Sequence, residues 1–189
     1  QQGTSLTLTA EATEGYGFVH WTKNGTVIDG SNTLSIEVGV DVPAEYVANF
    51  AQYTIEASVN PTAGGSVDVV STTDGNQSTG SYAHGATATL STTAAEGYTF
   101  VNWTKGEEIV GTNTTYRTQS IEGDSTYVAN YNINISVTAV NGNAVISSHN
   151  NVSSGNYAEG TPLTLTATAS EGYGFVNWTK NGAVIEGDE

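Results

Sequence analysis

Three histidines have the widest chemical repertoire in this chain, because imidazole ligates metals and moves protons near neutral pH. They are His20, His84 and His149, and no two of them stand at the spacing of a metal site. The carboxylates form no Asp-x-Asp-x-Asp-Gly loop for calcium, and cysteine is absent. We find no nucleophile–base pair or paired acids. The sequence therefore predicts no metal site, no cofactor and no enzyme.

A covalent crosslink is a second candidate chemistry. The three lysines, Lys23, Lys105 and Lys180, occupy one position of a recurring motif, and glutamates recur with them at positions 14, 96 and 171. A lysine–asparagine isopeptide bond assisted by a carboxylate would need these groups buried together. The alternative is a solvated strand end beside a turn, with an ion pair worth under about 1 kcal/mol. The second interpretation is favoured, because nothing in the sequence indicates that these lysines and glutamates are buried.

The tryptophans are able either to stack on sugars or to fill a core. Each one follows a phenylalanine by three residues, and two tyrosines recur further along the chain. Fixed apolar neighbours favour core packing. The predicted structural core is Trp21, Trp103, Trp178, Phe18, Phe100, Phe175, Tyr46 and Tyr127.

Seven Asn-x-Ser/Thr sequons occur, at Asn24, Asn76, Asn102, Asn113, Asn134, Asn151 and Asn177. Asn102 and Asn177 stand beside the predicted core tryptophans, where a glycan fits poorly. Asn76, Asn113 and Asn151 fall in predicted loops. These three are the candidates for glycosylation in a host that glycosylates.

The chemistry-bearing residues recur because the chain repeats itself. Residues 15–23 (GYGFVHWTK) return as 97–105 (GYTFVNWTK) and as 172–180 (GYGFVNWTK). A closing element, YVANF at 46–50, returns as YVANY at 127–131. We expect a first repeat at 1–52 that lacks its opening strands, a complete repeat at 53–131, and a third at 132–189 that lacks its closing strands.

The elements that carry these residues are predicted to be strands. Leu6, Leu8 and Ala10 alternate with threonines, a period of two, and no stretch keeps a helical period. Asn24-Gly25 and Asn181-Gly182 each directly follow a tryptophan motif and predict two-residue hairpin turns. The fold class is therefore all-β, built of small tandem modules with little or no helix. Adjacent repeats are expected to meet with almost no linker.

Composition narrows the function further. With 4 basic and 19 acidic residues the formal net charge is −15, which excludes binding to nucleic acid or to an anionic membrane surface through basic patches. No apolar run is long enough to insert in a bilayer. Hydrophobic residues make up 37% of the chain, enough for thin cores only. Charged residues make up only 12% of the chain, cysteine is absent, and threonine, serine and asparagine are abundant. This composition suits an extracellular protein.

Three features carry a resemblance to a known family: the tryptophan motif, the Gly-x-x-(x)-Leu-Thr strand and the closing Tyr-Val-Ala-Asn-aromatic element. By these features the chain resembles the divergent internalin B-repeat family of bacterial surface proteins. The resemblance covers the whole chain and implies β-grasp-like modules, with a small sandwich as the alternative. It implies no catalytic residues and a place at the cell surface. We expect a structural segment of a stalk or fibre. The alternative is an adhesin module that recognises a glycan or host protein, with its site in the variable loops at 71–79 and 106–115.

The two ends of the sequence carry a further expectation. Both fall inside a repeat, and the first residue is not methionine. An unpaired sheet edge is a liability that another strand must cover. The expected partners are therefore neighbouring repeats, of the same longer chain or, by strand exchange into a filament, of adjacent chains.

Overall fold

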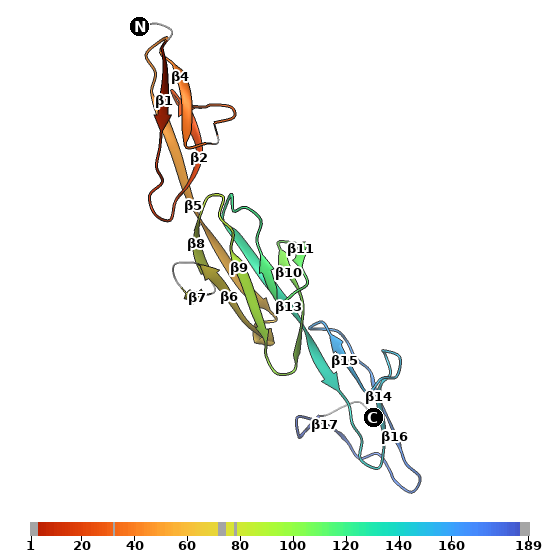
Figure 1. Ribbon diagram of the computed structural model, residues 1–189. Helices are drawn as coiled ribbons and strands as arrows, with labels where there is room; N and C mark the ends of the chain where they lie inside the picture. The colour runs from red at the N-terminus through yellow and green to blue at the C-terminus, as the bar shows by residue number, and fades with distance from the viewer. Residues whose placement is uncertain (1–3, 32, 72–74, 78, 186–189) are drawn as a thin grey trace. The chain divides into compact units, whose positions relative to one another are not determined.

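The computed structural model describes residues 4–31, 33–71, 75–77 and 79–185, and nearly all of their regular structure is β-strand (Figure 1). Helical structure in these residues amounts to one 3-10 turn, η1 (Thr62–Gly64). No helix among them is long and apolar enough to cross a membrane. The prediction of an all-β fold with little or no helix is confirmed.

Contacts between residues divide the chain into two units. The first consists of Gln1–Ala95 with Phe100–Tyr131, and the second of Glu96–Thr99 with Asn132–Glu189. Repeats 1 and 2 therefore fall largely in the first unit, and repeat 3 in the second. The repeat limits at 52/53 and 131/132 stay predictions, and repeats 1, 2 and 3 denote the segments that they define.

Repeat 1 contains two small antiparallel arrangements. In one, β1 (Ser5–Thr9) pairs with β4 (Ser35–Gly39). In the other, β2 (Gly17–Lys23) lies between β3 (Thr26–Val27) and the first part of β5 (Tyr46–Asn60). The tryptophan motif is thus carried by a strand with a paired strand on each side.

The strand β5 belongs to both repeat 1 and repeat 2. Its residues up to Ala51 pair with β2, and those from Gln52 onward pair with strands of repeat 2. The predicted closing strand of one repeat and opening strand of the next are therefore one uninterrupted strand (Figure 1). No linker separates the two repeats.

Repeat 2 is formed by two sheets. Its strands beyond β5 are β6 (Gly65–Ser71), β7 (Gly75–Gln77), β8 (Thr79–Ala83), β9 (Thr89–Ala94), β10 (Tyr98–Lys105), β11 (Glu108–Gly111), β12 (Thr115–Arg117) and β13 (Ser125–Ser136). One sheet has the order β11-β10-β13-β5, with β8 also paired to β5, and the other has the order β12-β9-β6-β7. The pair β5/β13 is parallel, and the other pairs whose register is given are antiparallel.

The core of repeat 2 lies between these sheets. Trp103, Ile55 and Ala129 are buried on the first sheet, and Val69 and Leu90 are buried on the second. Alternation along each strand places these side chains on the inner face and leaves the intervening polar residues outside. The repeat is therefore a small sandwich whose first and last strands lie side by side.

Repeat 3 has shorter and fewer pairings. The end of β13 pairs with β15 (Ser154–Tyr157), β14 (Gly142–Ile146) with β16 (Leu165–Ala169), and β17 (Trp178–Lys180) with β18 (Ala183–Ile185). The strand of the tryptophan motif is only three residues long here, against seven in β2 and eight in β10.

Both predicted hairpin turns are confirmed. Lys23 pairs with Thr26 around Asn24-Gly25, and Lys180 pairs with Ala183 around Asn181-Gly182. The four turn residues all have positive φ, between 49° and 83°. Asparagine and glycine are the residues that adopt this conformation most readily, and it matches the twist of the flanking strands.

Candidate functional site

A cluster of three aromatic rings recurs in repeats 1 and 2. In repeat 1, Phe18 lies 6.1 Å from Trp21 and 5.5 Å from Phe50, measured between ring centroids. In repeat 2, Phe100 lies 6.0 Å from Trp103 and 5.7 Å from Tyr131. The third ring comes from the closing element in each case and meets the phenylalanine edge-on, a favourable geometry for aromatic pairs.

A bulge allows both rings of the motif strand to face the core. The register of β2 against β5 shifts between Phe18 and His20. Residues three apart on a regular strand would point to opposite faces. The extra residue in the strand restores Phe18 and Trp21 to the same face.

The indole nitrogen of each of these tryptophans is bound by a loop. Trp21 donates its Nε1–H to the carbonyl oxygen of Thr33 at 3.0 Å, and Trp103 donates to that of Asn113 at 3.1 Å. Both indoles are buried. Their polar atom is thus paired, and stacking of these rings on a sugar is excluded by their burial.

In repeat 3 the expected core is incomplete, which corrects the prediction for Phe175 and Trp178. Phe175 is 59% exposed and Trp178 is only half-buried, although their rings keep the same spacing of 5.8 Å. The physical reason is that no described strand of repeat 3 takes the place of the closing element that supplies Phe50 and Tyr131. Tyr127 is buried, whereas Phe18, Phe100 and Tyr46 are half-buried.

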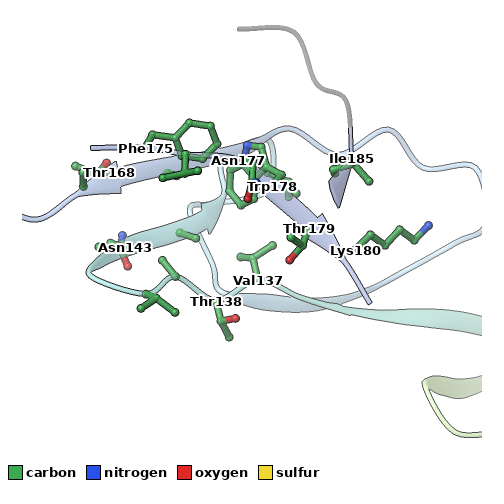
Figure 2. Close-up of a pocket in the computed structure, with 18 of the residues that line it drawn as sticks. Val137, Thr138, Asn143, Thr168, Phe175, Asn177, Trp178, Thr179, Lys180 and Ile185 are labelled. Carbon is green, nitrogen blue, oxygen red and sulfur yellow. The ribbon is translucent and has the colours of Figure 1, made fainter. Parts of the chain in front are cut away.

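An open cavity of about 940 Å³ therefore lies beside Trp178 (Figure 2). Its lining includes Val137, Leu165, Phe175 and Ile185. Its size is in the range of ligand pockets, and its walls combine apolar and polar side chains.

The motif lysines lie over tyrosine rings. Lys23 Nζ is 5.5 Å from the ring centroid of Tyr46, and Lys105 Nζ is 5.8 Å from that of Tyr127. Each lysine thus makes a cation–π contact with the first residue of the closing element. Among the described residues no ion pair is found for either lysine.

His84 and His149 each lie beside a tyrosine ring. His84 contacts the ring of Tyr53 at 6.0 Å, and its Nδ1 is buried without a hydrogen-bond partner. His149 contacts the ring of Tyr157 at 5.0 Å. No group of three or more His, Asp or Glu residues in the described parts of the chain is arranged to hold a metal ion.

Two tyrosines have perturbed acidity. Burial raises the pKa of Tyr82 above its usual 10.0, and it also raises the pKa of Tyr127, with a smaller contribution from Tyr116. Tyr82 donates its hydroxyl to the carbonyl oxygen of Val70 at 2.8 Å. Tyr116 is the acidic side chain beside Tyr127, with the two ring centroids 5.8 Å apart.

The candidate glycosylation sites differ in their surroundings. Asn113 and Asn151 are exposed, whereas Asn76 lies in β7 and its side chain is outside the described part of the structure. Asn102 is half-buried, and its Oδ1 accepts a hydrogen bond from Asn130 at 2.9 Å. The variable loop at 71–79 also includes residues outside the description, at 72–74 and 78.

A set of polar side chains along the pair β5/β13 was not predicted from the sequence. Asp124 Oδ1 accepts the backbone N–H of Thr54 at 2.7 Å, and Asn60 Nδ2 donates to Asn130 Oδ1 at 3.3 Å. Asn130 Nδ2 donates in turn to Asn102 and Thr104 on β10. The recurrence of Asn130 in the closing element was the only sign of this set in the sequence. Its partners Asn60, Asn102 and Thr104 lie 26 to 70 residues away in the chain.

Comparison with family models matches three successive segments of the chain to the divergent InlB B-repeat domain, at residues 1–54, 55–140 and 133–189. The first junction falls inside β5, and the second and third matches both include the end of β13. Comparisons with curated proteins and with solved structures found no significant match. The matches cover the whole chain, and the chain therefore belongs to the divergent InlB B-repeat family, which indicates a repeat domain of a bacterial surface protein.

Proposed function

We propose that this chain is a non-catalytic structural segment of an extracellular stalk or fibre at the cell surface. The observation that carries the proposal is β5, which runs without a break from Tyr46 to Asn60 and serves two repeats. A strand shared by two repeats holds one repeat in a fixed position on the next and carries tension between them, whereas a flexible linker does not hold the repeats in place. Partners of the segment are neighbouring repeats.

The surface chemistry supports the same role. A net charge of −15 keeps the chain soluble and makes copies repel one another. The aromatic clusters of repeats 1 and 2 are turned to the core, with indole N–H groups already bound by loop carbonyls. Such a segment spaces and supports other domains without presenting a reactive site.

An adhesin module is the second candidate, and the cavity beside Trp178 favours it. Its apolar wall with exposed Phe175 is suited to the flat face of a sugar ring or to an apolar side chain of a host protein. Against it stands the correspondence with repeats 1 and 2, where a closing strand covers the equivalent rings.

A surface-display experiment separates the two functions. The chain is placed between a membrane anchor and an epitope tag, and the control carries the tag directly on the anchor. A stalk gives access of the tag to antibody-coated beads only when the chain is present, and the chain alone gives no binding on glycan arrays or host cells. Saturable binding that is lost in Phe175→Ala would overturn the stalk assignment in favour of the adhesin.

A further inference from the structure

We propose that the parallel pair β5/β13 is a force-bearing clamp of repeat 2, an inference that rests on the proposed stalk function because a stalk is pulled from its ends. The chain enters repeat 2 through β5 and leaves it through β13. Any tension along the polypeptide therefore passes through these two strands, which are direct neighbours in one sheet.

The direction of the strands decides how their hydrogen bonds carry the load. Ile55–Asn60 of β5 runs parallel to Ser125–Asn130 of β13, with six residue pairs in register. Tension pulls β5 toward its amino end and β13 toward its carboxyl end, which are opposite ends of the ladder. The strands must then slide past each other, so the bonds are loaded together in shear and not opened one after another.

Side chains fasten both ends of this ladder. At the start, Asp124 Oδ1 holds the N–H of Thr54, one residue before the first pair, in a charge-assisted bond of 2.7 Å. At the far end, Asn60 donates to Asn130 across the last pair at 3.3 Å. Sliding by even one residue breaks both contacts.

Asn130 also connects the clamp to the third strand of the sheet. Its Nδ2 lies 2.9 Å from Asn102 Oδ1 and 3.2 Å from Thr104 Oγ1, both on β10. A load on β13 is thereby shared with β10, the strand that carries the buried Trp103.

The inner face of the ladder is closed to water. Ile55 and Ala57 of β5, and Tyr127 and Ala129 of β13, are all buried. A backbone hydrogen bond that is strained on this face finds no water molecule to replace its partner, and an unpaired buried group is costly. The burial therefore raises the force needed to start the sliding.

Pulling the 189-residue chain in two directions tests the clamp. The chain has no cysteine, so pairs of introduced cysteines give unique attachment points for DNA handles. Gln52→Cys with Ser136→Cys loads the ladder in shear. Gln52→Cys with Gly123→Cys applies the force at one end of the ladder and peels it; an added Cβ at Gly123 meets no atom within 4 Å. Unfolding force is expected to be several-fold higher in the shear pair.

A matched pair of variants tests the side-chain fastening. Asn130→Ala removes the contacts to Asn60, Asn102 and Thr104, and is expected to lower the shear force while leaving the peeling force unchanged. Asn132→Ala makes the same change two residues beyond the ladder and is expected to alter neither force.

Circular dichroism and thermal melting establish that each cysteine variant is folded before it is pulled. Equal unfolding forces in the two directions, with both proteins folded, overturn the clamp. That outcome leaves the display experiment untouched, because a segment without a clamp still spaces a tag from the surface. Loss of tag access with a high shear force would instead reject the stalk and keep the clamp geometry.

Discussion

Trp103 donates its indole N–H to the backbone carbonyl oxygen of Asn113, 3.1 Å away in the loop that follows β11. Trp21 makes the same bond to Thr33 in repeat 1. The recurring tryptophan is therefore held by packing against Phe100 and by a polar contact to a loop whose sequence varies between repeats. Because a backbone carbonyl is the acceptor, the loop is free to change its side chains.

Trp103→Ala is expected to lower the free energy of unfolding of repeat 2 by about 3–5 kcal/mol, because it leaves a cavity in a fully buried site. Trp178→Ala is the matched control and is expected to cost clearly less, since Trp178 is half-buried. Urea denaturation followed by circular dichroism measures both. Equal losses would show that the two tryptophans are equally buried in solution.

Gly17→Ala is expected to destabilise the junction of repeats 1 and 2. A Cβ at position 17 would lie 2.1 Å from the carbonyl oxygen of His84, a backbone atom of the next repeat. Overpacking of this kind costs about 1–3 kcal/mol.

Gly174→Ala provides the control, because Gly174 occupies the same motif position in repeat 3 and a Cβ there meets nothing within 4 Å. Its thermal melting temperature is expected to match that of the parent chain. If both substitutions shift melting equally, intrinsic glycine effects explain the loss and the contact with His84 does not.

Local patterns in the sequence predicted the strands, the two Asn-Gly turns and the buried positions of Trp21 and Trp103, because each depends on neighbouring residues. The continuity of β5 was harder to predict, since Tyr46–Phe50 and Tyr53–Val59 read equally well as two strands. Burial of Phe175 was expected from its motif alone. Burial depends on a distant covering strand, which a local pattern does not supply.

The side-chain hydrogen bonds along the pair β5/β13 could not be predicted from the sequence for a similar reason. Nothing in the sequence around Asp124 points to a partner, and only the parallel register brings its carboxylate to Thr54. Likewise, the contact of Asn60 with Asn130 joins residues 70 positions apart. Long-range register of this kind is set by the whole sheet.

Alkaline pH is expected to destabilise the chain through Tyr82 and Tyr127. Both have a pKa raised above 10.0 in the folded protein by burial, so the unfolded chain loses these protons first. The stabilisation is complete below pH 10 and is lost as the pH rises through the folded pKa values. Urea midpoints measured from pH 8 to 11 are expected to fall above about pH 10. In Tyr127→Phe the fall is expected to be shallower, and an unchanged slope would contradict the assignment.

Expression in a host that attaches N-linked glycans is expected to modify Asn113 and Asn151, which are exposed, and to leave Asn102 unmodified. Asn102 is half-buried and its Oδ1 accepts a hydrogen bond from Asn130, so its side chain is held against β13 and is not free to enter a glycosyltransferase. Peptide mass spectrometry after glycosidase treatment in heavy water locates the modified asparagines. Occupancy at Asn102 equal to that at Asn113 would show that the contact does not protect it.

The intact mass of the purified chain is expected to equal the mass of its sequence, with no isopeptide crosslink. Each Lys–Asn crosslink would release one ammonia, but Lys23 and Lys105 lie over the rings of Tyr46 and Tyr127. The amide of Asn130 is also engaged, since it donates to Asn102 and Thr104. The contact in place of a crosslink is worth about 0.5–1 kcal/mol at an exposed site. Tyr46→Leu is therefore expected to lower the free energy of unfolding by a small amount. Adding Lys23→Met to Tyr46→Leu is expected to cause no further loss, because the lysine has already lost its partner ring. A mass deficit of one ammonia that disappears in Lys105→Arg would show instead that the lysine is covalently bound.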